Sequence, residues 1–289
     1  IGEAGTSPPA HSIIADMFPT KERGTAMGIY SLGVNFGILI GFVVGGWVAQ
    51  WYGWRAAFHI VGLPGLLIAL LVFLTLREPK RGQSDGYKQD SSPAPHPIAV
   101  FKFLWSQRSF RHLAIGSGLA AFIGYGVVTW LPAYLMRSFE MEPGPIGTYL
   151  AFIIGVAGGA GTFLGGYVAD KLSHRDIRWN TWVPAIAGLI ALPFSFGIYY
   201  FATSGEMALL FFVLPAFLGN LYLPTSLAMI QSVSTLRSRA AASALWLFIV
   251  NMIGMGIGPQ AVGFLSDYYQ QFFGIESLRY ALFTLSFVG

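Results

Sequence analysis

The sequence contains no cysteine and few charged residues. Asp, Glu, Lys and Arg make up only 10% of the 289 residues, compared with about 25% in a soluble domain. Hydrophobic residues make up 54% of the chain, and the mean hydropathy is +0.60. Because cysteine is absent, disulfides, zinc-thiolate sites and cysteine nucleophiles are excluded. The composition predicts an integral membrane protein.

Charge is absent from seven long stretches, each longer than the roughly 20 residues that cross a bilayer as a helix. These stretches are 24–54, 56–76, 112–136, 143–169, 179–205, 207–236 and 240–266. The short alternating segments of a β-barrel are also missing, so we expect helices. Residues 1–17 resemble the end of another span and 280–289 the beginning of one. The chain also lacks an initial methionine and a signal peptide, so we expect a fragment of a longer protein.

Basic residues are distributed unevenly between the linkers that join these spans. Alternate linkers hold fourteen Lys and Arg residues, whereas the opposite linkers hold three, Arg55, Arg137 and Arg279. Loops rich in Lys and Arg face the cytoplasm. The pI near 9.3 therefore reflects topology, and no nucleic-acid partner is needed to explain it. We expect a multi-pass protein of the cell membrane, either inner or plasma membrane.

The linker "EPKRGQSDGYKQDSSPAPHP" at 78–97 is polar and rich in Pro, Ser and Gly, which is typical of a solvated connection. It predicts three parts. Residues 1–77 form the end of an N-terminal half, 78–109 a cytoplasmic linker, and 110–289 a C-terminal half.

A repeat relates the two sides of this linker. At an offset of 216 the matching pairs are Pro8 with Pro224, Arg23 with Arg239, and Asn35 with Asn251. At an offset of 217, Gly37, Gly41 and Gly46 match Gly254, Gly258 and Gly263. Two related halves are typical of secondary transporters. Counted this way, the spans are helices four to twelve of a twelve-helix protein, truncated at both ends.

The segment "GGYVADKLSHRD" at 165–176 resembles the loop signature of the major facilitator superfamily. Gly166, Asp170, His174 and Arg175 match it, while Lys171 replaces an arginine and Ser173 a glycine. A carboxylate at a helix C-terminus needs a cation, and Lys171, Arg175 and Arg239 are candidates for Asp170. The resemblance implies that this acid is a latch on the cytoplasmic side. The alternative is a plain loop cluster that anchors helix ends.

Four further stretches are similar to spinster-like transporters of that superfamily. They are "GEAGTSPPAHSIIADMFP" at 2–19, "GYGVVTWLPAYLMRSFEM" at 124–141, "GGYVADKLSHRDIRW" at 165–179 and "GPQAVGFLSD" at 258–267. The resemblance implies an all-α integral membrane protein with the superfamily fold, built of two six-helix halves. It also implies an amphipathic substrate, either lipid-like or an organic anion.

Glu3 is expected deep in the membrane, about 20 Å from the cytoplasmic end of its helix. An acid at that depth usually faces a wet cavity and carries function, and burial favours its protonated form. Ser7 and His11 follow at spacings of four on the same face, and Pro8 and Pro9 free backbone carbonyls beside it. The resemblance implies that Glu3 takes part in proton coupling and substrate release. The alternative is a structural carboxylate near the outer interface.

Other polar and aromatic residues are candidates for a gate or a cavity. Asp16 and Arg23 lie at the cytoplasmic end of the first helix and are expected at the gate. The cavity candidates are Tyr125, Trp130, Tyr134, Asn220 and Asn251, although such aromatics also form interfacial belts. The glycine series Gly33, Gly37, Gly41 and Gly45, like its counterpart at 254–263, indicates either close helix packing or a gating hinge.

No metal-ligand cluster, phosphate loop or nucleophile triad is present in the sequence, so we expect no cofactor and no enzyme. The favoured hypothesis is a monomeric secondary active transporter that works by alternating access. Its partners would be protons, a small-molecule substrate and the lipid bilayer. The alternatives are a sugar, drug or carboxylate transporter of the same superfamily, or a receptor or scaffold that keeps the fold without transporting.

Overall fold

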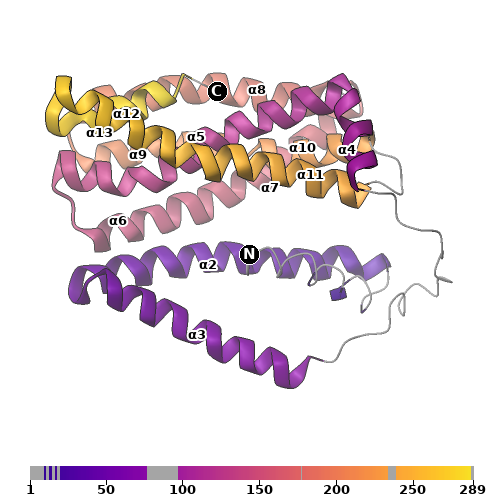
Figure 1. Cartoon of the computed structure of the whole chain (residues 1–289), viewed down its shortest axis with the longest axis horizontal. Coiled ribbons are helices and arrows are strands. Elements are labelled where there is room, and N and C mark those ends of the chain that lie inside the picture. The colour runs from indigo at the N-terminus through magenta and orange to yellow at the C-terminus, as the bar shows by residue number, and fades with distance from the viewer. Residues whose placement is uncertain are drawn as a thin grey trace. The chain divides into compact units, whose positions relative to one another are not determined.

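The computed structural model describes residues 20–76, 97–176, 178–233 and 239–287, together with residues 10, 13–14 and 17. Its secondary structure is helical in all of these ranges, with no strand among them (Figure 1). The chain divides into two units, Ile1–Pro93 (unit 1) and Ala94–Gly289 (unit 2), and each is considered by itself. The predicted all-α fold is confirmed.

Unit 1 contains a pair of long helices, α2 (Thr20–Tyr52) and α3 (Trp54–Thr75). They are joined through Gly53 alone, which has φ 82°. Glycine adopts this region without a steric penalty, so the turn between the two helices can be one residue long. No described residue of α3 is buried within unit 1.

Unit 2 is a bundle of helices, several of which contain a π-helical segment. Its elements are α4 (Pro97–Ser106), α5 (Arg108–Phe139), α6 (Pro143–Leu150), η2 (Ala151–Gly158), α7 (Gly159–Ser173), α8 (Trp179–Phe196), η3 (Gly197–Phe201), α9 (Gly205–Gly219), α10 (Tyr222–Val233), α11 (Arg239–Asn251), η4 (Met252–Ile257), α12 (Gly258–Phe273), the 3₁₀ turn η5 (Gly274–Glu276) and α13 (Ser277–Leu285). The segments η2, η3 and η4 are π-helical.

Six stretches of the described residues are long and apolar enough to cross a membrane. They are Trp54–Thr75, Arg108–Phe139, Pro143–Ser173, Trp179–Phe201, Gly205–Leu227 and Ala241–Leu285. The last stretch includes the return helix α13, and a shorter apolar helix covers Phe36–Tyr52. Helices therefore lie over all seven of the charge-free stretches predicted to span the membrane.

One helix lies within the range 78–109 that the sequence predicted to be a cytoplasmic linker. Residues 97–106 form α4, and Val100 and Leu104 on one of its faces are buried. These two apolar residues, one helical turn apart, pack in a core with Phe110 of α5 and Trp246 of α11. The indole nitrogen of Trp246 has no hydrogen-bond partner among the described residues.

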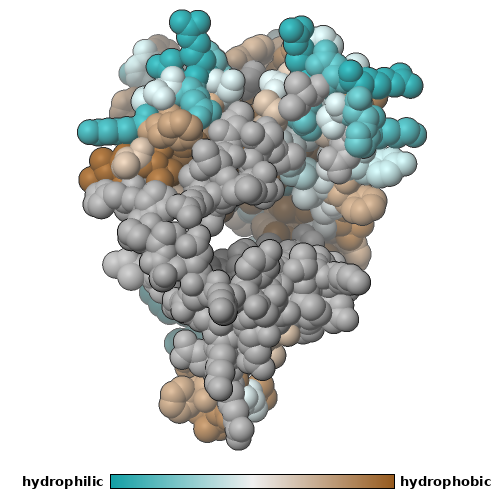
Figure 2. Space-filling model, turned by 90° about the vertical axis from the view of Figure 1, so that its right-hand side faces the viewer, coloured by the Kyte–Doolittle hydropathy of each residue, from teal (hydrophilic) through white to brown (hydrophobic). Residues whose placement is uncertain are grey.

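The two ends of unit 2 carry different charges. We call the end at which α5, α8 and α11 begin the basic end; its cations are Lys102, Arg108, Arg111, Lys171, Arg175 and Arg178. The opposite end carries Glu140, Glu142, Glu206 and Glu276, together with Arg137 and Arg279. Figure 2 looks toward the basic end and shows its hydrophilic side chains in groups, with hydrophobic residues beside them. This asymmetry follows the predicted positive-inside pattern.

Helix α7 meets the end of α9 and the turn between α9 and α10 through glycine. A methyl group on Gly165 would lie 2.8 Å from the Cα atom of Leu221, and one on Gly161 would clash with the carbonyl oxygen of Phe217. Neighbouring Gly166 has more room, since its methyl group would lie 3.5 Å from Pro224. Small residues thus let these backbones approach closely, as is common between membrane helices.

The second glycine series also makes close contacts, in this case with α5. A methyl group on Gly258 would lie 2.6 Å from the carbonyl oxygen of Phe122, and one on Gly254 the same distance from Ala121. The close-packing interpretation therefore holds for this copy. The first copy differs. No described atom lies within 4 Å of the position that a methyl group would take on Gly33, Gly37, Gly41 or Gly45.

Gly165→Ala is expected to destabilise the protein by about 1–3 kcal/mol, because the added methyl group meets backbone atoms that cannot move aside. Gly166→Ala is the matched control, where the methyl group makes an ordinary contact and alanine favours the helix. Thermal unfolding of the two variants in detergent measures the difference. Equal unfolding temperatures would show that the close approach of Gly165 to the backbone of Leu221 does not contribute to stability.

Candidate functional site

The predicted gate loop follows α7 at the basic end. The carbonyl oxygen of Leu172 accepts hydrogen bonds from the backbone N–H groups of Arg175 at 3.0 Å and Asp176 at 3.2 Å. Lys171 lies in the last turn of α7, and its side chain is exposed, like those of His174 and Arg175. A cation here is favourable, since the C-terminus of a helix carries partial negative charge.

Asp170, the acid predicted to act as a latch, lies in the last turn of α7. Its side chain is outside the described residues, as are those of Arg23 in α2 and Arg239 at the start of α11. The latch therefore stays a prediction. Its exposed candidate partners Lys171 and Arg175 lie on the same turn and loop.

Asp176 has a role that the sequence analysis missed. Its Oδ1 atom accepts the backbone N–H of Arg178 at 2.9 Å, and its carbonyl oxygen accepts that of Trp179 at 3.1 Å. The side chain thus satisfies a backbone donor at the start of α8, the common use of aspartate before a helix. The signal was available, because an Asp shortly before an apolar run indicates a helix start.

Two of the predicted cavity residues have clear packing roles. Tyr134 is 1% exposed, and its hydroxyl donates to the carbonyl oxygen of Ile198 at 3.1 Å. Trp130 donates its indole N–H to the carbonyl oxygen of Pro259 at 2.8 Å, and its ring lies against Gly263. Contact of either residue with a substrate stays a prediction.

The other three cavity candidates lie on different helices of unit 2. Asn220 ends α9, and its side-chain nitrogen donates to the carbonyl oxygen of Ala216 at 2.7 Å while facing Gly158 of η2. Tyr125 is 36% exposed and its ring lies beside Gly254. Asn251, at the end of α11, is exposed within unit 2. Tyr125 and Asn251 are therefore the more accessible candidates.

The predicted coupling residues Glu3, Ser7 and His11, and the gate residue Asp16, lie outside the described residues. Their roles stay predictions. The long helices α2 and α3 of unit 1 follow these residues in the chain.

A second polar cluster that the sequence analysis missed joins α13 to η3 at the opposite end. Arg279 donates its Nε–H to the carbonyl oxygen of Tyr199, and its Nη1 atom lies 3.4 Å from Glu276. The rings of Tyr199 and Tyr134 pack with their centroids 5.6 Å apart. The sequence analysis used Arg279 only to assign the topology of its linker. No neighbouring residue in the sequence indicates that its partner is Tyr199 on another helix.

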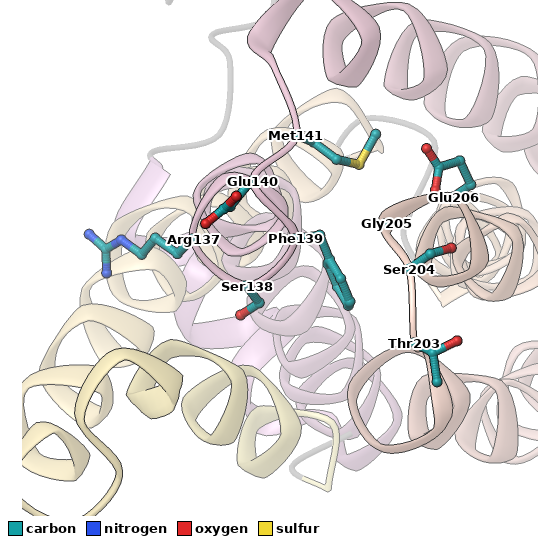
Figure 3. A pocket seen from close by; sticks show the side chains of 9 residues that line it. All are labelled: Arg137, Ser138, Phe139, Glu140, Met141, Thr203, Ser204, Gly205 and Glu206. Carbon is teal, nitrogen blue, oxygen red and sulfur yellow. The ribbon is translucent and has the colours of Figure 1, made fainter.

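A cavity of about 410 Å³ opens at this end, between the end of α5 and the start of α9 (Figure 3). Its lining residues are Arg137, Ser138, Phe139, Glu140, Met141, Thr203, Ser204, Gly205 and Glu206. Several of them shape helix ends. Glu140 has φ 53° and ends α5, and Ser204 accepts the backbone N–H of Met207 at 3.2 Å to begin α9. None of the predicted site residues lines this cavity.

Asp176→Ala is expected to destabilise the protein by about 1 kcal/mol, because the start of α8 loses its side-chain acceptor. Asp176→Asn retains an oxygen in the same place and should unfold close to the wild-type temperature. Thermal unfolding of both variants provides the comparison. If the asparagine variant were as unstable as the alanine variant, the charge of Asp176 rather than its acceptor would stabilise the loop.

The profile of the Major Facilitator Superfamily matches residues 1–287. A curated relative, an MFS-type efflux pump of Mycolicibacterium smegmatis, is 32% identical, over 99% of this chain and 65% of its own length. A cis,cis-muconate transport protein of Acinetobacter baylyi is 29% identical, over 89% of this chain and 61% of its own length. The chain thus spans less than two thirds of these relatives.

A solved structure is also similar over the whole chain. It is a bacterial homologue of the human lysosomal transporter Spinster, in an inward-facing and unoccupied conformation. It is 29% identical with a TM-score of 0.85, covering 100% of this chain and 73% of that one. This likeness and the profile agree with the loop motif at the end of α7. The chain belongs to the Major Facilitator Superfamily and is spinster-like.

Proposed function

We propose that the complete protein is a secondary active transporter that works by alternating access and couples a small-molecule substrate to protons. The observation that carries this proposal is the superfamily match over residues 1–287. Members of this superfamily are built of two related halves that rock about a central site. The repeat between the residues following Arg23 and Arg239 agrees with that build.

The proposed substrate is amphipathic, either lipid-like or an organic anion. Two similarities support this class. One curated relative is named for the transport of muconate, an organic anion, and a solved neighbour is a homologue of the lysosomal transporter Spinster. The exposed Tyr125 and Asn251 of unit 2 would supply an apolar ring and a neutral hydrogen-bonding amide to such a molecule.

Proton coupling is assigned to Glu3. Of the thirteen acidic residues, it is the one that the sequence predicts to lie far from both ends of a span. A buried carboxylate can be protonated in one conformation and ionised when it meets water in the other, and this difference biases the equilibrium between the two conformations. Ser7 and His11 share its predicted helix face and would bind the proton or substrate with it.

The gate is assigned to the basic end. Asp170, with Lys171, Arg175 or Arg239, would close the cytoplasmic side as an ion pair and separate when the site opens inward. Asp16 and Arg23 would take part from the first half. The protein would act as a monomer in the cell membrane.

The test uses the complete protein in liposomes that contain a pH-sensitive dye, challenged with lysolipids, organic acids, sugars and drugs. An amphipathic substrate is expected to drive proton flux. Glu3→Gln should abolish this flux, because glutamine cannot exchange a proton. The control is Glu142→Gln, an exposed acid at the opposite end that does not line the cavity, which should behave like wild type. Proton flux that persists in Glu3→Gln would assign Glu3 a structural role, and absence of proton flux with every substrate would refute proton coupling in favour of a uniporter or a scaffold.

A further inference from the structure

Helix α4 is a short, separate helix of unit 2 that differs in direction from the long ones (Figure 1). Its ten residues extend about 15 Å, roughly half of the hydrocarbon thickness of a bilayer. Figure 1 shows α4 at the end of unit 2, turned across the direction of the long helices. A helix of this length and orientation cannot span the membrane, but it can lie along the membrane surface.

One face of α4 is fixed to the bundle. Val100 and Leu104 are 4% and 0% exposed, and both pack into the core that contains Trp246. This contact sets the rotation of α4 about its axis, so that its remaining residues point away from the core.

Apart from Lys102 and Ser106, the remaining described side chains of α4 are apolar, although they are exposed on unit 2. Ile98 and Phe103 are 60% and 46% exposed, and the rings of Phe101 and Trp105 are stacked with their centroids 5.6 Å apart. Exposed aromatic residues of this density are costly in water, and they are enriched where a protein meets the headgroup region of a bilayer.

Among the described residues, the charges on α4 and in the first turn of α5 have one sign. Lys102 lies on the helix, and Arg108 and Arg111 lie in the first turn of α5. The sequence contains no Asp or Glu from 97 to 139, and α11, which also packs on α4, has none from 239 to 251. These cations thus have no acidic residue on α4, α5 or α11 to neutralise them at this end.

We propose that α4 is an interfacial helix that binds the anionic surface of the cytoplasmic leaflet. Its aromatic side chains enter the boundary between headgroups and acyl chains, while Lys102 and Arg108 bind lipid phosphates. Apolar and basic residues together on one short helix are typical of such binding. A free phosphate ion would use the cations alone and leave the aromatic rings in water. The proposal does not depend on what the protein transports.

The absence of cysteine makes a direct test possible in the complete protein. A fluorophore is attached to Phe103→Cys, or in the control to His174→Cys, an exposed residue of the α7–α8 loop at the same end. The proteins are reconstituted in phosphatidylcholine vesicles that contain phosphatidylglycerol. Lipids with a spin label near the headgroup should quench the label at position 103, and aqueous iodide should quench the label at position 174.

Two results would overturn the membrane contact. Quenching of the 103 label by iodide alone would mean that α4 faces water. Protection from both quenchers would mean that other protein covers this face.

The need for anionic lipid is tested by comparing how strongly spin-labelled phosphatidylglycerol and spin-labelled phosphatidylcholine quench the fluorophore at position 103. Quenching should favour the anionic lipid, and Lys102→Gln and Arg108→Gln should each lower this preference about fivefold. Arg178→Gln, an exposed cation at the start of α8, is the matched control and should leave it unchanged. Equal quenching by both lipids in the wild type would refute the binding of anionic lipid.

Discussion

Backbone carbonyl groups at helix ends and breaks are the constraint on which the packing of unit 2 depends. Where such groups are buried in protein, water cannot satisfy them, and the last carbonyls of a helix have no partner within it. At the end of η3, Tyr134 donates to Ile198 and Arg279 to Tyr199. Asn220 does the same for Ala216 near the end of α9. Donors from α5 and α13 thus fix the broken helix η3 in place.

Much of this architecture could be predicted from the sequence. The charge-free stretches locate the spanning helices, since length and apolarity alone decide whether a helix can cross a bilayer. The π-helical segments η2, η3 and η4 were not predicted, because they depend on contacts between helices. Helix α4 was also missed. The polar residues at 78–97 dominate the composition of the predicted linker and concealed the buried pair Val100 and Leu104.

The candidate site was harder to predict. Aromatic residues on a spanning helix can line a cavity or fill a gap, and sequence spacing is the same in both cases. Tyr134 and Trp130 each have a carbonyl partner on another helix, which no local pattern could indicate. The loop motif was located correctly at the end of α7, because its charges mark a helix end. The role of Asp176 depends on a local hydrogen bond and could have been predicted from helix-capping preferences.

Glycine determines how unit 2 can move as well as how it packs. Where Gly161, Gly165 and Gly258 meet a neighbouring backbone, no side chain can rotate to absorb a displacement, so the helices must move together or separate. The hydrogen bond from Trp130 to Pro259 holds the start of α12 against α5 at one of these contacts. Such contacts favour movement of the packed helices as one body, which is what the proposed rocking of two halves requires. In the proposed transporter we therefore expect conformational change at weaker contacts, such as exposed loops and the predicted ion pairs of the gate.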